Sequence, residues 1–318
     1  MTGPLPRDAR VFVAGHRGLV GSAIVRHLEA QGFVNLITRT RSELDLLDAH
    51  AVDELFERER PEIVILAAAK VGGILANATY PADFLYQNLM IAANVIHAAH
   101  RFDVTKLLNL GSSCIYPKHA PQPIPESALL TGPLESTNRA YAIAKIAAIE
   151  LCDAYRAQHG RSFISAMPTN LYGPGDNFDL ATSHVLPALI RKAVEAKEAG
   201  APSITVWGTG APRREFLYVD DLAEACLFLL EHFDDGGPIN VGTGEDVTIR
   251  ELAELVCQVI GYEGELEFDA SKPDGTPRKL LDVHRLRKAG WHHRTRIEAG
   301  VSETVAWYRR ISRDEQRR

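Results

Sequence analysis

Residues 10–21 read RVFVAGHRGLVG, an apolar run that ends in a loop with three glycines. The apolar run is typical of a buried strand, a helical pattern follows the loop, and residues 34–38 form the next predicted strand. Gly15 allows a tight bend, Gly18 lets the backbone approach a diphosphate, and Gly21 lets helix and strand pack closely. This order predicts a βαβ unit that binds a dinucleotide, with the spacing Gly-x-x-Gly-x-x-Gly.

The alternation of strands and helices continues through the first half of the chain. Further strands are predicted at 63–66, 106–110 and 163–168, and long helices at 80–101 and 139–159. The helix at 80–101 has more apolar positions than one stripe requires, which suits a dimer interface beside a core contact. The alternating pattern predicts an α/β fold with a Rossmann-type doubly wound parallel sheet.

The second half of the chain has shorter elements, which predict a smaller mixed α/β lobe that binds substrate. We expect a dinucleotide-binding domain over residues 1–174, with return segments around 216–250, and a mainly substrate-binding domain over 175–318. Helix N-caps in this part are predicted at Asp220 and Thr248.

The composition of the 318 residues is that of an ordinary globular protein, with 46% apolar residues, 24% charged residues and a net charge of −6. This charge balance provides no basic groove for nucleic acid, and no apolar run is long enough for a signal peptide or a membrane span. The four cysteines form no Cys-x-x-Cys pair, and three of them are predicted core residues, Cys152, Cys226 and Cys257. We expect a cytoplasmic enzyme without a metal site or membrane contact.

The end of the second strand indicates which nicotinamide cofactor is bound. A carboxylate there binds the ribose 2′-hydroxyl of NAD, whereas an arginine accommodates the 2′-phosphate of NADP. Arg39 and Arg41 occupy this place, no carboxylate precedes Glu43, and Arg17 in the glycine loop offers another guanidinium. The sequence therefore favours NADP(H). The competing interpretation is that both arginines are ordinary surface residues.

A tyrosine and a lysine four residues apart begin the helix predicted at 139–159. Tyr141 and Lys145 therefore lie on one helical face. A phenol titrates near pH ~10, and a neighbouring ammonium is expected to lower that pKa, which would suit proton transfer to a carbonyl oxygen. Ser112, at the end of the strand 106–110, is placed to hydrogen-bond the same oxygen. Such pairs are common on helices, so the interpretation depends on the glycine loop and on Ser112.

The glycine loop, the Tyr-x-x-x-Lys pair and the upstream serine together resemble the extended short-chain dehydrogenases/reductases. Five segments narrow the resemblance to the GDP-L-fucose synthase family: 15–23, 67–73, 111–117, 168–174 and 272–281. The resemblance covers residues 9 to 308. It implies an NADPH enzyme with two activities in one site, which epimerises GDP-4-keto-6-deoxy-D-mannose at C3 and C5 and then reduces the C4 ketone to give GDP-L-fucose.

The resemblance assigns roles to particular residues. It implies that Tyr141, Lys145 and Ser112 serve the reduction, and that Cys114 and His184 are the acid/base pair of the epimerisations, with nearby cations lowering the pKa of the thiol. Without it, Cys114 would be interpreted as a structural cysteine. The cofactor-binding residues that it implies are Gly15, His16, Arg17, Gly18, Leu19, Val20, Gly21, Arg39, Arg41, Ser42, Glu43, Leu44, Leu110, Gly111, Ser112, Ser113, Lys145, Pro168, Thr169, Asn170, Leu171 and His184.

The substrate-binding positions of the family fall on Lys192, Trp207, Arg214, Asp274 and Lys279. Trp207 is expected to pack against a ribose or sugar, Arg214 to neutralise the diphosphate and Asp274 to accept hydrogen bonds. At position 192 the family commonly has an arginine, whereas this chain has Lys192. The lysine keeps the positive charge but loses the bidentate hydrogen-bonding geometry of a guanidinium.

Three alternatives stay open at this stage. A nucleotide-sugar 4-epimerase usually has a carboxylate after the second strand, and a 4,6-dehydratase usually has an acidic pair where this chain has Ser113 and Cys114. A non-catalytic NADP-binding regulator typically lacks the tyrosine or the lysine. The family resemblance also implies a homodimer.

Overall fold

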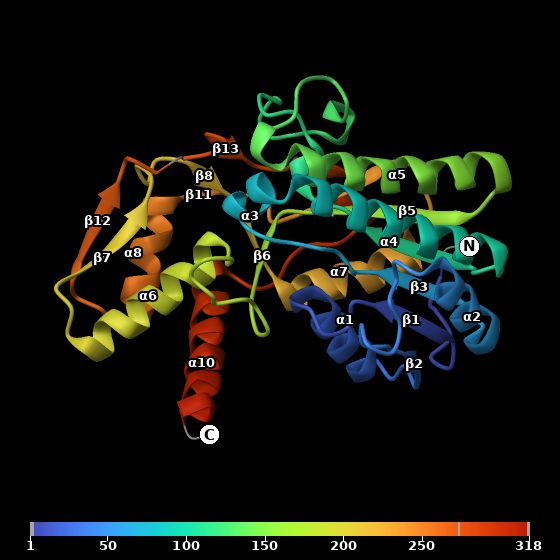
Figure 1. Cartoon of the computed structure of the whole chain (residues 1–318), viewed down its shortest axis with the longest axis horizontal. Helices are drawn as coiled ribbons and strands as arrows, with labels where there is room; N and C mark the ends of the chain where they lie inside the picture. The colour runs from blue at the N-terminus through green and yellow to red at the C-terminus, as the bar shows by residue number, and fades with distance from the viewer. Residues whose placement is uncertain (1–2, 273, 317–318) are drawn as a thin grey trace.

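A six-stranded parallel sheet forms the centre of the computed structural model, which describes residues 3–272 and 274–316 (Figure 1). Met1, Thr2, Pro273, Arg317 and Arg318, which fall within the two predicted domains, lie outside the described residues. The strand order is β10-β5-β4-β3-β1-β2, with β1 (Arg10–Ala14), β2 (Asn35–Ile37), β3 (Ile63–Leu66), β4 (Lys106–Leu110), β5 (Ser162–Pro168) and β10 (Pro238–Val241). The α/β fold class predicted from the sequence is therefore confirmed.

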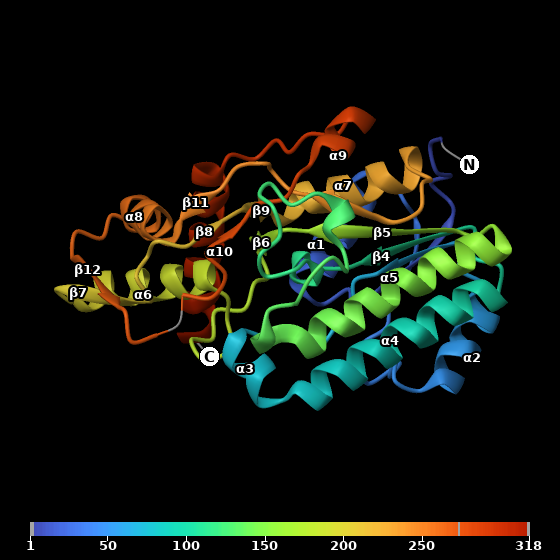
Figure 2. The ribbon, with the colours of Figure 1, turned by 90° about the horizontal axis from the view of Figure 1, so that it is seen from above.

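Helices cover both faces of this sheet, as Figure 2 shows. One face is covered by α1 (Leu19–Ala30) and α7 (Val219–His232). The other is covered by α2 (Ala49–Glu59), α4 (Pro81–Arg101) and α5 (Arg139–His159). Because strands of a parallel sheet are buried on both faces, they contain continuous apolar runs such as the one that opens the chain.

The glycine loop between β1 and α1 leaves no space for side chains at two of its glycines. A Cβ atom added to Gly15, whose φ is +88°, would lie 2.7 Å from the backbone nitrogen of Ala68. A Cβ atom at Gly21 would lie 2.1 Å from the carbonyl oxygen of Gly15. Close packing of helix and strand, expected from the glycine spacing, is thus present.

The second lobe consists of small sheets and three longer helices, at the left of Figure 1. Its helices are α6 (Val185–Ala199), α8 (Ile249–Ile260) and α10 (Ile297–Gln316), which share one apolar core. Its strands form the pairs β7 (Ser203–Trp207) with β12 (Glu265–Asp269) and β6 (Asn170–Tyr172) with β9 (Phe216–Tyr218), and the three-stranded sheet β11 (Val247–Thr248), β8 (Arg213–Arg214) and β13 (Arg278–Lys279). The remaining short helices are α3 (Ile74–Thr79), α9 (His284–Ala289) and the 3-10 turns Ser113–Ile115, Glu126–Ala128 and Ser136–Asn138.

Of the two predicted N-cap residues, one caps its helix and the other does not. Thr248 caps α8 and forms the capping box with Glu251, as predicted. Asp220 is not a cap: α7 begins at Val219, so that Asp220 lies in its first turn and forms an ion pair with Arg26 at 2.6 Å. An acidic side chain in a first turn is stabilised by the helix dipole whether or not it caps.

Among the described residues, no helix is long and apolar enough to cross a membrane, and no group of three or more His, Cys, Asp or Glu side chains could hold a metal ion. All four cysteines are free and buried. Cys152, Cys226 and Cys257 are core residues, as predicted.

Candidate active site

The loops after β1 and β2 enclose a hollow at one end of the main sheet. Because the strand order reverses between β1 and β3, the crevice beyond the carboxyl ends of these strands is where open α/β sheets bind ligands. The hollow has a volume of about 680 Å³ and is lined by Gly15, His16, Arg17, Gly18, Arg39, Thr40, Arg41, Ser42 and Asp45.

The predicted phosphate-binding arginines border this hollow, and they differ in whether the guanidinium is held by other protein groups. Arg39 is anchored, since its guanidinium donates to Glu59 at 2.5 Å and to the carbonyl oxygen of Thr38 at 2.7 Å. Arg17 and Arg41 are exposed to solvent. Glu43 turns back to accept hydrogen bonds from the backbone N–H and hydroxyl of Thr40, which holds the pKa of its carboxyl below the usual range. The exposed guanidinium groups of Arg17 and Arg41 are therefore available here, although the carboxylate of Asp45 also lines the hollow.

The residues around this hollow fit a phosphorylated dinucleotide. Nδ1 of His16 is buried and has no hydrogen-bond partner among the described residues. The backbone of the glycine loop is uncovered at Gly18, where a Cβ atom would meet no neighbour closer than 3.5 Å. Ser42 is exposed and lines the hollow, whereas Leu44 is buried and is not among the residues that line it.

The end of β4 brings the predicted reduction residues together. Lys145 is 7% exposed and donates to the carbonyl oxygen of Leu110 at 2.8 Å. Its Nζ lies 5.8 Å from the centre of the Tyr141 ring, so the two side chains share one helical face as predicted. Oγ of Ser112 accepts a hydrogen bond from the backbone N–H of Cys114 at 3.4 Å.

The expected effect of Lys145 on the phenol is wrong for this structure. Burial raises the pKa of Tyr141 above its ordinary value, and Cys114 adds to the increase. Burial also lowers the pKa of Lys145 to about 8, so that the ammonium itself is disfavoured. The sequence argument considered the attraction between the two groups, whereas the cost of removing each charge from water dominates here.

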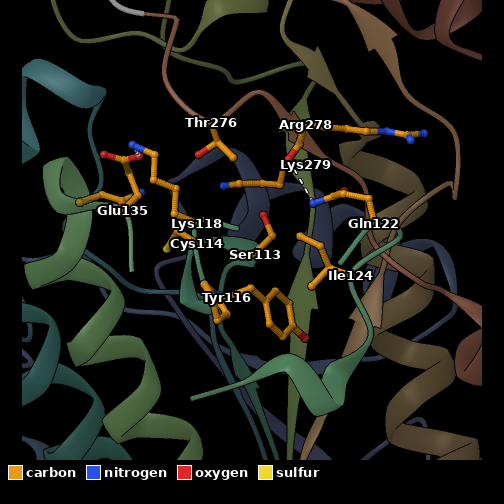
Figure 3. A pocket seen from close by; sticks show the side chains of 12 residues that line it. Ser113, Cys114, Tyr116, Lys118, Gln122, Ile124, Glu135, Thr276, Arg278 and Lys279 are labelled. Carbon is orange, nitrogen blue, oxygen red and sulfur yellow. Dashed lines mark hydrogen bonds and ion pairs between the residues drawn. The ribbon is translucent and has the colours of Figure 1, made fainter. Parts of the chain in front are cut away.

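A pocket beside the end of β4 contains Cys114 and Lys279, although these residues are far apart in the sequence (Figure 3). Ser113, Lys118 and Glu135 line the same pocket, and Lys118 forms an ion pair with Glu135 at 2.8 Å. Burial raises the pKa of the Cys114 thiol, while Lys279, Ser112 and Lys145 oppose the increase. The expectation that cations lower this pKa is therefore wrong in its net direction.

His184 immediately precedes α6 as its N-cap residue. Its side chain reaches solvent, yet the protein atoms around it lower the pKa of the imidazole, and Lys279 lowers it further. Lys279 thus influences both predicted members of the acid/base pair.

The predicted substrate residues form two neighbouring groups. Arg214 and Lys279 are paired in the register of β8 and β13, and Arg214 donates to the carbonyl oxygen of Asp274 at 3.3 Å. Lys192 donates to the carbonyl oxygen of Thr205 and lies 5.8 Å from the ring of Trp207, which is 56% exposed. Both carboxylate oxygens of Asp274 accept hydrogen bonds from Thr209.

The sequence profile of the NAD dependent epimerase/dehydratase family matches residues 11–242, well over half of the chain. The chain belongs to this family. The match begins at β1 and ends directly after β10, and so spans all six strands of the main sheet.

Relatives from plants and bacteria place the chain more narrowly within the family. It is 61% identical to GDP-L-fucose synthase 1 of Arabidopsis thaliana over 95% of this chain and 94% of the relative. It is 59% identical to GDP-L-fucose synthase of Escherichia coli strain K12, over 94% and 96%. A GDP-L-fucose synthetase from Naegleria fowleri bound to NADP superposes with a TM-score of 0.91 at 31% identity, over 98% of this chain and 96% of that one. This member of the family therefore groups with the GDP-L-fucose synthases, and neither the epimerase nor the dehydratase alternative is better supported.

The sequence analysis missed several residues at this family site. Thr40 and Asp45 line the dinucleotide hollow, and Lys118 and Glu135 line the pocket at Cys114. Glu215, directly after Arg214, is a carboxylate with no exposed surface. Nothing in the neighbouring sequence indicates this burial, because an acid beside two arginines is also typical of a solvated surface.

Proposed function

We propose that this chain converts GDP-4-keto-6-deoxy-D-mannose into GDP-L-fucose, first inverting C3 and C5 and then reducing the C4 ketone with NADPH. The observation that carries the proposal is the pocket shared by Cys114 and Lys279 beside Ser112 and Tyr141. For the reduction the protein need supply only donors at the ketone oxygen, because the hydride comes from NADPH. A thiol placed beside these donors is suited to proton transfer at the neighbouring carbons, which the ketone makes acidic.

Tyr141 and Ser112 serve the C4 oxygen in both halves of this reaction. With its pKa raised by burial, Tyr141 carries its proton at neutral pH and can donate a hydrogen bond to an enolate oxygen. The same hydroxyl then protonates the oxygen during reduction. Lys145, which faces the Tyr141 ring, would hold the nicotinamide ribose.

Cys114 removes the protons at C3 and C5, and His184 returns protons from the opposite face. In the resting protein the raised pKa of Cys114 and the lowered pKa of His184 place the proton on the thiol. Only the small fraction with a thiolate and an imidazolium is then active. Lys279 favours the thiolate within that fraction.

The cofactor is held by the glycine loop and the arginines after β2. Arg17 and Arg41 would bind the ribose phosphate, and Pro168–Leu171 would lie against the nicotinamide. When bound, NADPH supplies the hydride for C4.

The substrate diphosphate would be bound by the cations of the paired strands β8 and β13, Arg214 and Lys279, with Lys192 as a further cation. Trp207 offers an exposed ring for stacking on a ribose or base. Asp274 keeps acceptor capacity beyond its bonds to Thr209.

The test follows NADPH oxidation by absorbance with GDP-4-keto-6-deoxy-D-mannose, with the product identified by NMR. We expect turnover to GDP-L-fucose. A C4-reduced sugar without inversion would leave a simple reductase and return Cys114 to a structural role. No turnover with NADPH still bound would refute the proposed substrate.

We propose further that the protein is a cytoplasmic homodimer that binds neither membrane nor nucleic acid. Support for the dimer comes from exposed apolar side chains on the paired helices α4 and α5, Tyr86, Leu89 and Ile143, which are 60%, 38% and 39% exposed. Light scattering of the purified protein and of a Tyr86→Glu/Leu89→Glu variant tests this surface. A wild-type monomer would refute it.

A further inference from the structure

Glu215 lies between β8, which carries the predicted substrate residue Arg214, and β9, which pairs with β6 beside the predicted cofactor site. Arg214 on β8 precedes it and is in register with Lys279 on β13. Phe216 on β9 follows it and is in register with Asn170 on β6. A single residue therefore connects the predicted diphosphate site to the segment predicted to line the nicotinamide.

The carboxylate of Glu215 receives hydrogen bonds from two separate segments. One oxygen accepts from the backbone N–H of Gly244 at 2.7 Å and from the hydroxyl of Thr243 at 3.4 Å. The other accepts from the backbone N–H of Leu281 at 3.0 Å, two residues beyond Lys279. The side chain is completely buried, and within residues 3–272 and 274–316 it forms no ion pair.

The backbone of Glu215 makes the third connection. Its carbonyl oxygen accepts from Nδ2 of Asn170 at 2.7 Å and from the hydroxyl of Thr169 at 3.2 Å. Gly242 leaves the space that the carboxylate fills, because a Cβ atom there would lie 2.2 Å from the nearer oxygen. Burying an acid without a cation is costly, so these donors must compensate for lost hydration.

We propose that Glu215 is a positioning residue that fixes the substrate strands β8 and β13 relative to the nicotinamide segment 168–171. The inference rests on the proposed function for the identity of the ligand, a GDP-sugar. Glu215 does not touch the reacting atoms. It sets where Arg214 and Lys279 hold the diphosphate, and hence where the sugar carbon lies with respect to the cofactor.

The test compares Glu215→Gln with a matched control. Glutamine has the same shape but replaces one acceptor oxygen by an NH₂ group, which cannot accept from Gly244 or Leu281. Asp221→Asn is the control, because Asp221 is 5% exposed and likewise accepts from two backbone N–H groups and a hydroxyl, of Arg294 and Thr295, away from the substrate strands. GDP and NADPH affinities are measured by calorimetry, kcat and KM by turnover, and backbone opening by hydrogen exchange.

We expect Glu215→Gln to weaken GDP binding and kcat/KM for the sugar about ten- to a hundredfold, as expected for hydrogen bonds to a charged group. NADPH affinity should stay within about twofold, because the glycine loop is untouched. Amide exchange at residues 278–283 should accelerate in this variant alone. Asp221→Asn should lose a similar amount of thermal stability and keep its GDP affinity.

Equal loss of GDP and NADPH affinity, or behaviour indistinguishable from that of Asp221→Asn, would overturn the proposal. If the glutamine variant does not fold, Glu215→Asp replaces it in the test, because the aspartate side chain is one methylene too short to reach the backbone N–H of Leu281. Unchanged GDP affinity in the aspartate variant would also overturn the proposal. A wild-type protein that binds no GDP refutes the proposed function. In that case the hydrogen exchange at 278–283 alone decides the role of Glu215.

Discussion

Replacing Lys145 by methionine should make the cofactor-free protein more stable near neutral pH while abolishing reduction. Lys145 is 7% exposed, and its pKa is lowered to about 8 by burial. Folding at neutral pH therefore places a charge where the protein disfavours it. Methionine has a similar length, no charge and enough flexibility to fill the space.

The magnitude follows from the pKa and from one hydrogen bond. A decrease from 10.5 to about 8 corresponds to about 3.4 kcal/mol of destabilisation while the lysine is charged in both states. Removing the bond to the carbonyl oxygen of Leu110 costs about 1–3 kcal/mol. The variant should therefore unfold with a free energy about 0–2 kcal/mol higher than that of the wild type at pH 7.

The pH dependence provides the sharper test. Since the folded pKa is below the unfolded one, the unfolded chain binds more protons between pH 8 and 10.5, and wild-type stability rises with pH in that window. The methionine variant lacks this term. Its advantage should therefore shrink by about 2.5 kcal/mol between pH 7 and pH 10.

Urea unfolding followed by tryptophan fluorescence at pH 7, 8, 9 and 10 measures both quantities. Lys288→Met, at an exposed position on α9, is the control, and its difference from the wild type should not change over this range. A difference for Lys145→Met that stays constant to about 0.5 kcal/mol from pH 7 to pH 10 would refute the reasoning.

Three further predictions concern the thiol, the cofactor pocket and the glycine loop. Solvent exchange of the C3 and C5 protons should vary little between pH 6.5 and 9.0. These limits are the ordinary pKa values of an imidazole and a thiol, and burial lowers the pKa of His184 from the first and raises the pKa of Cys114 from the second. Between them, each thiolate gained as the pH rises is offset by an imidazolium lost. Cys114→Ser should fold and lose most of this exchange, and exchange at the wild-type rate would show that Cys114 is not the base. Arg41→Asp should weaken NADPH binding at least about tenfold and NADH binding far less in fluorescence titrations, and equal losses would contradict a 2′-phosphate contact. Gly21→Ala should lower the free energy of unfolding by about 1–3 kcal/mol or more, because the added Cβ would lie 2.1 Å from a backbone oxygen. Gly18→Ala should change the free energy of unfolding by less than about 1 kcal/mol, because its added Cβ would have its nearest neighbour at 3.5 Å.

The sequence was sufficient for features that depend on neighbouring residues. The strands β3 and β4 and the helix α5 have the predicted bounds, because apolar runs and helical periodicity are local. The glycine loop and the Tyr141–Lys145 face follow from spacing alone. Some local details still failed: the helices α2 and α3 were not predicted, and Asp220 lies two positions after Tyr218, the N-cap residue of α7.

Features that depend on distant segments could not be derived from the residues themselves. The pocket at Cys114 needs Lys279, which reaches it only because β13 pairs with β8. The pKa directions of Tyr141 and Cys114 depend on how completely the fold removes water, which no spacing reveals. Glu215 was missed for the same reason, since all its partners are at least 28 positions away in the sequence.

The pairing of β10 with β5 has a consequence for synthesis on the ribosome. In the described part of the chain, one edge of β5 is paired with β10 alone, which is translated about 70 residues after β5 ends. At roughly 5–20 residues per second, that edge of the nascent chain stays open for roughly 4–14 s. An uncovered apolar strand edge is a template for pairing with other chains. A ribosome that stalls before residue 238 therefore displays an aggregation-prone fragment, and a chaperone that shields β5 during this interval would raise the yield of folded protein.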